Sequence, residues 1–261
     1  MTWSATQYTK FERERNRPIH DLLAQVTQTA VAKAADIGCG PGNSTELLRA
    51  RFPDAAITGM DSSENMITAA RKRLPDIRFE AADIATWPGD GGPYDVILAN
   101  AVLQWVPDHA ALMPSLLARL APGGSLAVQM PDNLDEPAHR MMRQVAADGS
   151  WAGKLDGASR DSRLGADWYY RTLHGQGAAV DIWRTTYHHV LPGGAGAIVE
   201  WFKGSALRPY LDRLDAAEGA DFLARYEAAI APFYPVMPDG TVLLPFPRLF
   251  FVATREGSGA A

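Results

Sequence analysis

The chain lacks the features of a disulfide-stabilised or membrane-spanning protein. It contains a single cysteine, Cys39, among 261 residues, so no disulfide can form within it. No uninterrupted apolar segment approaches the roughly 20 residues that a membrane-spanning helix requires. Residues 1–17 are polar and charged, without the apolar stretch of a secretory leader. We therefore expect a soluble protein of a reducing compartment, the cytoplasm.

Strong positive charge is also missing. The formal net charge is -5, and lysine and arginine form no dense block along the chain. Domains that bind nucleic acid usually carry a basic patch or stripe that contacts phosphates. The charge pattern therefore argues against a nucleic-acid partner and favours a small-molecule substrate, while it leaves the oligomeric state open.

The chain does contain a glycine loop between an apolar run and a helical pattern. In the segment Ala35-Asp36-Ile37-Gly38-Cys39-Gly40-Pro41-Gly42-Asn43, three glycines occupy alternate positions. Glycine permits backbone conformations that other residues avoid, and it allows a ligand to approach the backbone closely. We expect Asn43 to be the N-cap of a helix over 44–51. A strand, a glycine loop and a helix in this order are typical of doubly wound sheets that bind nucleotide-like cofactors.

Three further apolar runs also end at small polar residues. Asp61 follows the second run, Asp83 the third and Asn100 the fourth, as Asp36 ends the first. Each of these residues alone is more often an ordinary turn former. Four of them at one edge of a parallel sheet are better explained by one extended ligand. The spacing D-x-G-x-G-x-G differs from the G-x-G-x-x-G of dinucleotide sites, which disfavours a nicotinamide oxidoreductase.

Apolar patterning predicts an α/β fold. Strands and helices alternate to about residue 130, which indicates a parallel sheet with helices on both faces. Helices are expected over 19–28, with Pro18 in the first turn, and over 44–51, 64–73 and 109–120. After residue 131 the pattern changes, with an expected strand over 180–190, helical segments over 195–233 and a last strand over 241–254.

The loop, together with Asp61 and Asp83, resembles the class I S-adenosylmethionine-dependent methyltransferases. In that family the loop lies near the methionine part of the cofactor. The acid after the second strand binds the ribose hydroxyls, and the acid after the third strand approaches the adenine. The cofactor carries an ammonium group and no phosphate, so nearby acids are electrostatically favourable. The resemblance implies S-adenosylmethionine as cofactor, S-adenosylhomocysteine as its product, and these cofactor-binding residues: Arg17, Asp36, Gly38, Gly40, Asp61, Ser62, Met66, Asp83, Ile84 and Asn100.

Segments outside the loop extend the resemblance to nearly the whole chain. These segments are similar to the trans-aconitate 2-methyltransferase family within this class. The similar segments are Tyr8 to Pro18, Thr58 to Ser63, Leu103 to His109, Ala127 to Asn133, Asp181 to Tyr187 and Phe246 to Phe250. The resemblance implies a doubly wound, Rossmann-like, mostly parallel sheet of seven strands with an antiparallel last strand, plus a mainly helical substrate cap. It divides the chain into an N-terminal lid or helix over 1–29, a cofactor-binding core over 30–133, a cap insert over 134–240 with a sheet strand near 180–190, and the final strand of the core sheet over 241–255.

The activity that the resemblance implies is methyl transfer to a carboxylate oxygen of trans-aconitate, which gives a monomethyl ester. A carboxylate is already ionised near neutral pH, because such groups titrate around pKa 4. We therefore expect no catalytic general base and no metal. Positioning of the acceptor and exclusion of water should supply the rate enhancement.

Candidate substrate-binding residues combine cations, aromatics and a neutral donor. Arginines are expected to hold the carboxylates that do not react, in bidentate pairs. Arg184 lies in an expected strand, on one face with Ile182 and Thr186. Aromatic residues also fill cores, and arginines also lie on solvated faces. The predicted substrate contacts are Tyr8, Arg15, Gln104, Trp105, Tyr170 and Arg184.

Two other functions remain open from the sequence. The chain could be another small-molecule O- or C-methyltransferase of class I, in which case a group that deprotonates the acceptor is expected. It could also be a regulatory protein that binds S-adenosylmethionine without catalysis.

Overall fold

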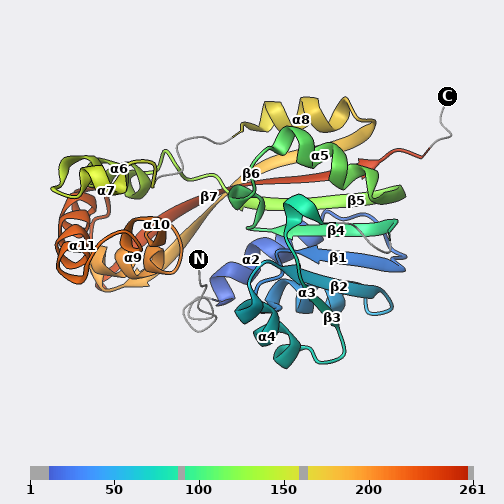
Figure 1. Ribbon diagram of the computed structural model, residues 1–261, viewed down its shortest axis with the longest axis horizontal. Helices are drawn as coiled ribbons and strands as arrows, with labels where there is room; N and C mark the ends of the chain where they lie inside the picture. The colour runs from blue at the N-terminus through green and yellow to red at the C-terminus, as the bar shows by residue number, and fades with distance from the viewer. Residues whose placement is uncertain (1–11, 88–91, 159–163, 258–261) are drawn as a thin grey trace. The chain divides into compact units, whose positions relative to one another are not determined.

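The computed structural model describes residues 12–87, 92–158 and 164–257 (Figure 1). These residues contain a seven-stranded sheet in the order β3-β2-β1-β4-β5-β7-β6. The neighbouring pairs from β3 to β5 are parallel, and the last strands run antiparallel to them. The predicted α/β class with a doubly wound, mostly parallel sheet is therefore confirmed. The strands are β1 Lys33–Ile37, β2 Ala56–Asp61, β3 Arg78–Ala81, β4 Tyr94–Asn100, β5 Leu120–Pro131, β6 Ala178–Pro192 and β7 Thr241–Arg255.

Helices and short 3₁₀ turns connect the strands. In the first part of the chain they are α2 Glu12–Leu23, α3 Asn43–Arg51, α4 Glu64–Arg73, η1 Ile84–Thr86, η2 Leu103–Trp105 and α5 His109–Ala118. In the second part they are α6 Pro137–Asp148, α7 Ala152–Leu155, α8 Ala166–His174, α9 Gly194–Lys203, α10 Arg208–Leu211, α11 Ala216–Ile230 and η3 Ala231–Phe233. Among the described residues, none of these helices combines the length and the hydropathy of a membrane span.

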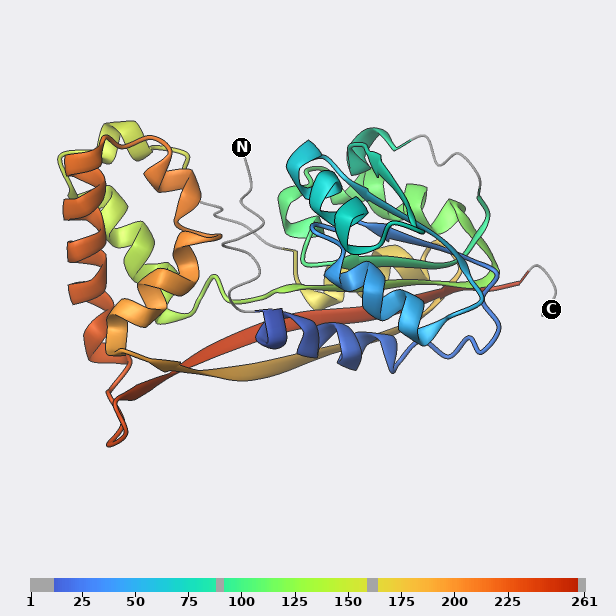
Figure 2. The same ribbon diagram turned by 90° about the horizontal axis from the view of Figure 1, so that it is seen from below.

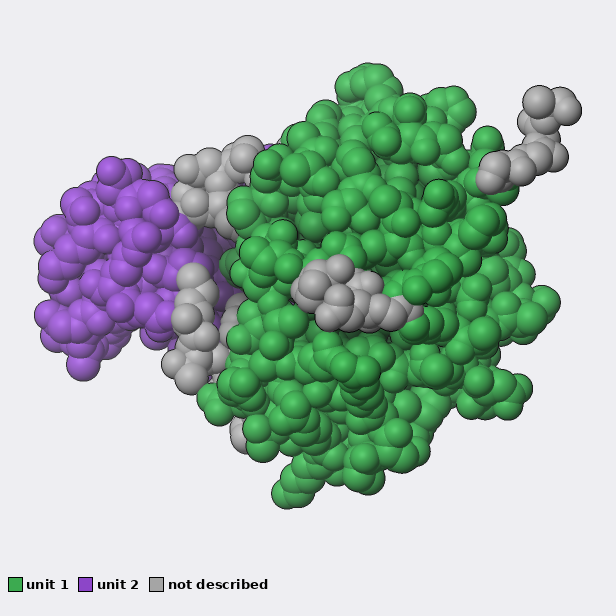
Figure 3. All heavy atoms as spheres, turned by 45° about the vertical axis from the view of Figure 1, so that its right-hand side comes forward, with its two compact units in different colours: residues 1–131, 164–185, 249–261 green, residues 132–163, 186–248 purple. Residues whose placement is uncertain are grey.

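The described residues divide into two compact units (Figure 3). Unit 1 lies within 1–131, 164–185 and 249–261, and unit 2 lies within 132–163 and 186–248. Helix α8 and the first half of β6 therefore group with the sheet, within the segment 134–240 that the sequence-based division gave as a cap insert with a sheet strand near 180–190. The physical reason is that Tyr169 and Leu173 of α8 are buried in the core of unit 1.

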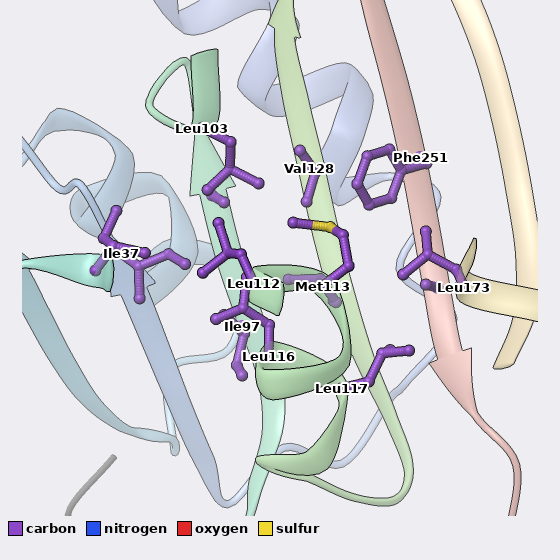
Figure 4. Packing of buried hydrophobic residues seen from close by; sticks show 14 of the residues in the cluster. Ile37, Ile97, Leu103, Leu112, Met113, Leu116, Leu117, Val128, Leu173 and Phe251 are labelled. Carbon is purple, nitrogen blue, oxygen red and sulfur yellow. The ribbon is translucent and has the colours of Figure 1, made fainter. Parts of the chain in front are cut away.

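The core of unit 1 on one face of the sheet is formed by α5, α8 and strands that include β1, β4, β5 and β7 (Figure 4). The α5 residues Leu112, Met113, Leu116 and Leu117 recur at helical spacing, and all four are buried against strand residues that include Ile97, Val128 and Phe251. Burial of such side chains contributes about 1.5–3 kcal/mol each. This packing fixes α5, and with it the segment between β4 and α5.

On the other face, α2 contacts α3 and β5 (Figure 2). The side-chain amide of Asn43 donates to Asn16 Oδ1 at 2.8 Å, which joins α3 to α2. Arg73 of α4 forms ion pairs with Glu12 of α2 and Glu46 of α3. Helix α2 is thereby attached to the two helices that follow the glycine loop and the second strand.

Two local predictions were wrong. The N-terminal helix was expected over 19–28 but is described from Glu12 to Leu23, with Pro18 inside it. Acidic residues in the first turn of this helix interact favourably with its dipole. The prediction overlooked this signal because it placed Pro18 in the first turn. Asn43 is not an N-cap, because Gly42 takes that position with φ 91°, a conformation that favours glycine.

Unit 2 is mainly helical, with the distal parts of β6 and β7. Helix α11 contacts α6 and α9. The Trp151 ring packs edge-on against Phe222, and the Arg225 guanidinium lies over the Trp151 ring. The Tyr234 hydroxyl accepts a hydrogen bond from the Ala138 amide at 3.0 Å, which ties the chain after α11 to the start of α6.

Candidate functional site

The glycine loop joins the carboxyl ends of the central strands. Gly38 and Gly40 have φ 75° and 55°, so both need the left-handed conformation. The Gly38 amide donates to the Met60 carbonyl at 2.7 Å, which fixes the loop against the end of β2. A Cβ at Gly38 would lie 2.3 Å from Val102, whereas a Cβ at Gly40 would meet no atom of the described residues within 4 Å. The backbone at Gly40 is thus open to a ligand.

Asp36 is fully buried beneath this loop. Its Oδ2 accepts hydrogen bonds from the hydroxyls of Ser44 at 2.7 Å and Thr45 at 2.6 Å. Its Oδ1 is buried and has no hydrogen-bond partner among the described residues. Burial raises the pKa of the Asp36 carboxyl to about 6, and the nearby Asp61 also raises it. The predicted cofactor residue Asp36 therefore lies under the loop and pins it to α3.

Asp61 lies at the end of β2 and faces the loop. Its Oδ2 accepts from the Gly40 amide at 3.0 Å, and its Oδ1 accepts from the Ser63 amide at 2.9 Å. Burial raises the pKa of the Asp61 carboxyl, and these two N–H groups oppose that shift. Since an ionised carboxylate offers about four acceptor positions, Asp61 keeps capacity for a ligand hydroxyl.

The next strand end contributes Asp83 and Ile84. The Ala82 amide donates to the Asp61 carbonyl at 3.0 Å, so β3 ends beside β2. Asp83 is exposed, and its Oδ1 accepts from the Ala85 amide at 2.9 Å, which starts the turn η1. Ile84 is buried, and so is Met66 on α4, while Ser62 is exposed.

Asn100 ends β4 but does not reach the surface. Its register partner is Gln129 of β5, and the Gln129 side-chain amide donates to Asn100 Oδ1. Both side chains are buried. Asn100 therefore braces β4 against β5, and Gln129 is a polar residue of this edge that sequence reasoning missed as a partner.

A short, bent segment follows β4. Ala101 and Asp108 both have φ 52°, a conformation that residues other than glycine rarely adopt. The Gln104 side-chain amide donates to the Ala101 carbonyl at 2.7 Å, and Trp105 is 36% exposed. Backbone strain of this kind concentrates at functional sites. The contact of Val102 with Gly38 places this segment beside the glycine loop.

The predicted N-terminal residues lie partly outside the described structure. Tyr8 falls outside the described residues. Arg15 is half-buried and Arg17 is exposed, both on α2. The bond between Asn16 and Asn43 brings this part of α2 to the first turn of α3, directly after the loop.

Tyr170 and Arg184 are exposed residues of unit 1. The Tyr170 ring is 43% exposed and stacks on His174 of its own helix at 5.5 Å between ring centroids. In β6, Ile182, Arg184 and Thr186 lie on the same face of the strand. Ile182 packs against the core, whereas Arg184 and Thr186 are exposed. The three residues therefore share a strand face as predicted, and Arg184 lies where that face changes from packed to exposed.

Cys39 is a packing residue. Its side chain is 1% exposed, and burial raises the pKa of its thiol above the ordinary value. Because the thiolate is the nucleophilic form, the thiol in this setting is unreactive.

The structure thus brings together the loop glycines, Asp61, the end of β3 and the segment after β4. Two carboxylates, Asp36 and Asp61, give this edge negative charge, and Gly40 leaves open space against the backbone. Asp36 Oδ1, a buried acceptor for which the described part of the chain offers no partner, lies beneath the same loop. These features fit a ligand with a positive charge and with hydroxyl groups, as S-adenosylmethionine has. Sequence reasoning missed Ser44 and Thr45, although hydroxyl residues after a glycine loop could have suggested bonds to Asp36.

Comparisons with known proteins give a consistent result. Residues 34–124 match a family model described as a methyltransferase domain. The trans-aconitate 2-methyltransferase of Methylobacterium nodulans is 57% identical over 255 residues, which cover 97% of this chain and 98% of the relative. The enzyme of the same name from Sinorhizobium medicae is 53% identical and covers 98% of this chain and 100% of the relative.

Among solved structures, the phosphoethanolamine N-methyltransferase 2 of Haemonchus contortus, in complex with phosphomonomethylethanolamine and S-adenosylhomocysteine, has a similar fold. Its TM-score is 0.56 at 15% identity, over 92% of this chain and 52% of that chain. At this identity the likeness concerns the fold alone.

Proposed function

Since the chain belongs to the trans-aconitate 2-methyltransferase family, we propose that it transfers a methyl group from S-adenosylmethionine to one carboxylate of trans-aconitate, which gives the monomethyl ester. The observation that carries the proposal is the 57% identity to a relative of that name over 97% of the chain. The glycine loop with Asp61 supports it, because this edge offers negative charge, hydroxyl-binding oxygens and open backbone.

Residues of the loop would hold the charged end of the cofactor. When bound, S-adenosylmethionine supplies an electrophilic methyl group on a positively charged sulfur. Gly38 and Gly40 shape the backbone there, and Asp36 keeps the loop attached to α3 through Ser44 and Thr45. Asp36 is fully buried, so its part in this proposal is to position the loop and to supply negative charge beneath it.

Other residues of the edge would hold the adenosine part. Asp61 has free acceptor capacity for ribose hydroxyls, next to the exposed Ser62. Asp83 is exposed at the end of β3 and can accept from an amino group. The apolar side chains of Met66 and Ile84, which follow these polar residues in the chain, are buried. Asn100 stabilises the end of β4. Arg17 on α2 contributes a positive charge to the proposed cofactor site.

The acceptor would lie against the segment after β4. A carboxylate at neutral pH is already ionised, so the enzyme needs to orient it and exclude water, without removing a proton. We assign Gln104 and Trp105 to the reacting carboxylate, because neutral donors leave its oxygen nucleophilic. We assign Arg15 and Arg184 to the other carboxylates, since a guanidinium on the reacting oxygen would lower its reactivity. Tyr8 and Tyr170 complete the proposed substrate contacts.

Mass spectrometry of the products tests this function. Purified enzyme would be incubated with S-adenosylmethionine and, separately, with trans-aconitate, cis-aconitate, citrate and isocitrate. A product heavier by one methylene unit, which alkaline hydrolysis converts back to the acid and methanol, is the expected ester. A methylated product that resists alkaline hydrolysis would indicate transfer to carbon. Binding of S-adenosylhomocysteine without product from any acid would contradict the proposal.

The pH dependence of the rate gives a second test. An ionised acceptor that needs no base predicts a rate that stays level above pH 6. Deprotonation of a phenolic or carbon acceptor would make the rate climb through the pKa of a base.

The remaining chemistry of the chain agrees with this setting. The net charge of -5 supports a small-molecule acceptor in preference to nucleic acid. The lone reduced cysteine supports a cytoplasmic location.

A further inference from the structure

We infer that His109 and Tyr169 are positioning residues that hold the turn η2, and with it Gln104 and Trp105, in the geometry needed to bind the acceptor. This inference rests on the proposed function, because Gln104 and Trp105 are its acceptor-binding residues. Their role is exerted through the turn, because His109 bonds to Leu103 and Tyr169 bonds to His109.

A chain of hydrogen bonds connects α8 to the turn. One imidazole nitrogen of His109, Nε2, lies 2.8 Å from the Leu103 carbonyl oxygen. The other, Nδ1, lies 2.7 Å from the Tyr169 hydroxyl. His109 is the first residue of α5, Leu103 the first of η2, and Tyr169 belongs to α8. Three elements that are separate in sequence therefore meet at one imidazole.

The partners assign the protons of this imidazole. A carbonyl oxygen can only accept, so Nε2 carries the hydrogen and donates to Leu103. In the neutral ring Nδ1 is then an acceptor, and the Tyr169 hydroxyl donates to it. The Met130 sulfur lies 3.7 Å from the same hydroxyl, and as a weak acceptor at a longer distance it competes poorly. Tyr169 thus selects the tautomer in which His109 holds Leu103.

The turn needs such an anchor because it is short and is bounded by unusual backbone. The Leu103 carbonyl also accepts from the Val106 amide at 3.0 Å, and the Val102 carbonyl accepts from the Trp105 amide at 2.9 Å. A 3₁₀ turn of three residues has little stability of its own. Positive φ at Ala101 adds strain before the turn. The buried Leu103 side chain and the His109 bond hold the turn in place.

Tyr169 is also a core residue, and the two roles can be separated. Its ring is 1% exposed, and it stacks on Phe251 with 5.1 Å between the ring centroids. Replacement by phenylalanine keeps this ring packing and removes only the hydroxyl. Any change in the turn that Tyr169→Phe causes therefore results from the loss of the hydrogen bond to His109.

Two substitutions of His109 separate its two nitrogens. In His109→Gln the side-chain amide can place a donor near the position of Nε2, which preserves the bond to Leu103. In His109→Asn the shorter side chain reaches only the region of Nδ1, so the bond to Leu103 is lost. Tyr226→Phe is the matched control, because it removes another buried tyrosine hydroxyl, one in unit 2 that has no described partner.

Hydrogen exchange of the Trp105 and Val106 amides measures the stability of the turn directly in the full-length protein. The measurement needs no substrate. We expect these amides to exchange at least tenfold faster in His109→Asn and Tyr169→Phe, while amides in the centre of β4 keep their protection. His109→Gln and Tyr226→Phe should exchange as the wild type does. Unchanged exchange in both His109→Asn and Tyr169→Phe would overturn the inference, and so would equal effects of Asn and Gln at position 109.

Kinetics then link the turn to the acceptor. In Tyr169→Phe we expect the KM for trans-aconitate to rise at least fivefold, with kcat reduced less than twofold and the Kd of S-adenosylhomocysteine unchanged. A wild-type enzyme that methylates no polycarboxylate would overturn the proposed function, and the exchange experiment would still decide whether His109 and Tyr169 hold the turn. If His109→Asn does not fold, Tyr169→Phe against Tyr226→Phe carries the same comparison.

Discussion

The carboxylate of Asp61 accepts a hydrogen bond from the backbone N–H of Gly40 at 3.0 Å. This bond joins the end of β2 to the middle of the glycine loop that follows β1. It fixes the distance between the open backbone at Gly40 and the residue assigned to the ribose hydroxyls. Together with the bond from the Gly38 amide to the Met60 carbonyl, it holds the two parts of the proposed cofactor site in register.

Asp61→Asn should weaken cofactor binding. The amide can still accept one backbone hydrogen bond, but it loses the negative charge and half of the acceptor capacity. We expect the Kd of S-adenosylhomocysteine to rise at least tenfold, which corresponds to about 1.4 kcal/mol. Isothermal titration calorimetry measures it, and Asp54→Asn, an exposed acid after α3, is the control. Equal affinities of both variants and the wild type would remove Asp61 from the site.

Gly40→Ala should affect binding beyond its effect on stability. An alanine at this positive φ costs about 1–2 kcal/mol of folding free energy. Gly123→Ala is the matched control, because Gly123 has φ 77° and its added Cβ would also lie more than 4 Å from any atom in the described part of the chain. We expect both variants to lower Tm by a similar amount. Only Gly40→Ala should bind S-adenosylhomocysteine more weakly than the wild type does. Full affinity in Gly40→Ala would show that no ligand approaches that backbone.

Asp36→Asn should change how stability depends on pH. Burial raises the pKa of Asp36 in the folded state to about 6, above the ordinary 3.8 of an aspartic acid. The folded state therefore binds more protons than the unfolded state between these values, and stability from this group is lost as pH rises through 6. The variant lacks this titration, while its amide oxygen can still accept from Ser44 or Thr45.

Urea unfolding between pH 4 and pH 7 measures that effect. The difference in unfolding free energy, variant minus wild type, should move in favour of the variant as pH rises, by about 2 kcal/mol. A difference that stays constant with pH would contradict the shifted pKa. A carboxylate that costs stability at neutral pH is expected where its charge serves the ligand.

Arg184→Leu should impair use of the acceptor. Loss of a bidentate guanidinium is expected to lower kcat/KM for trans-aconitate at least 100-fold, about 2.7 kcal/mol, and to leave the cofactor Kd within twofold. Arg171→Leu is the control, because this exposed arginine pairs with Asp167 on its own helix. Acceptor kinetics that match the control would exclude Arg184 from the site.

Local patterns sufficed for much of the fold. Helix α4 spans Glu64–Arg73 as its pattern predicts, and the last strand, expected over 241–254, spans Thr241–Arg255. The acids at the ends of β2 and β3 were identified because an apolar run that stops at a polar residue is visible in sequence. Such features depend on residues within one element, so no long-range contact is needed to find them.

The orientation of α8 shows where that reasoning stops. Trp168, Tyr169 and Tyr170 are consecutive aromatic residues, and sequence analysis selected Tyr170 for the site. In the structure Tyr170 is 43% exposed, and Tyr169 is the one in the core that bonds to His109. Which side of a helix faces the sheet is decided by packing against other elements.

By itself, the sequence determined the α/β class, the glycine loop and the acids that end the strands, because apolar periodicity and backbone requirements are local properties. Only the tertiary structure decided that Asp36 is buried under the loop, that Gly42 caps α3, and that one imidazole links Leu103 to Tyr169. Burial, helix phase and hydrogen bonds between distant residues arise when separate elements pack together.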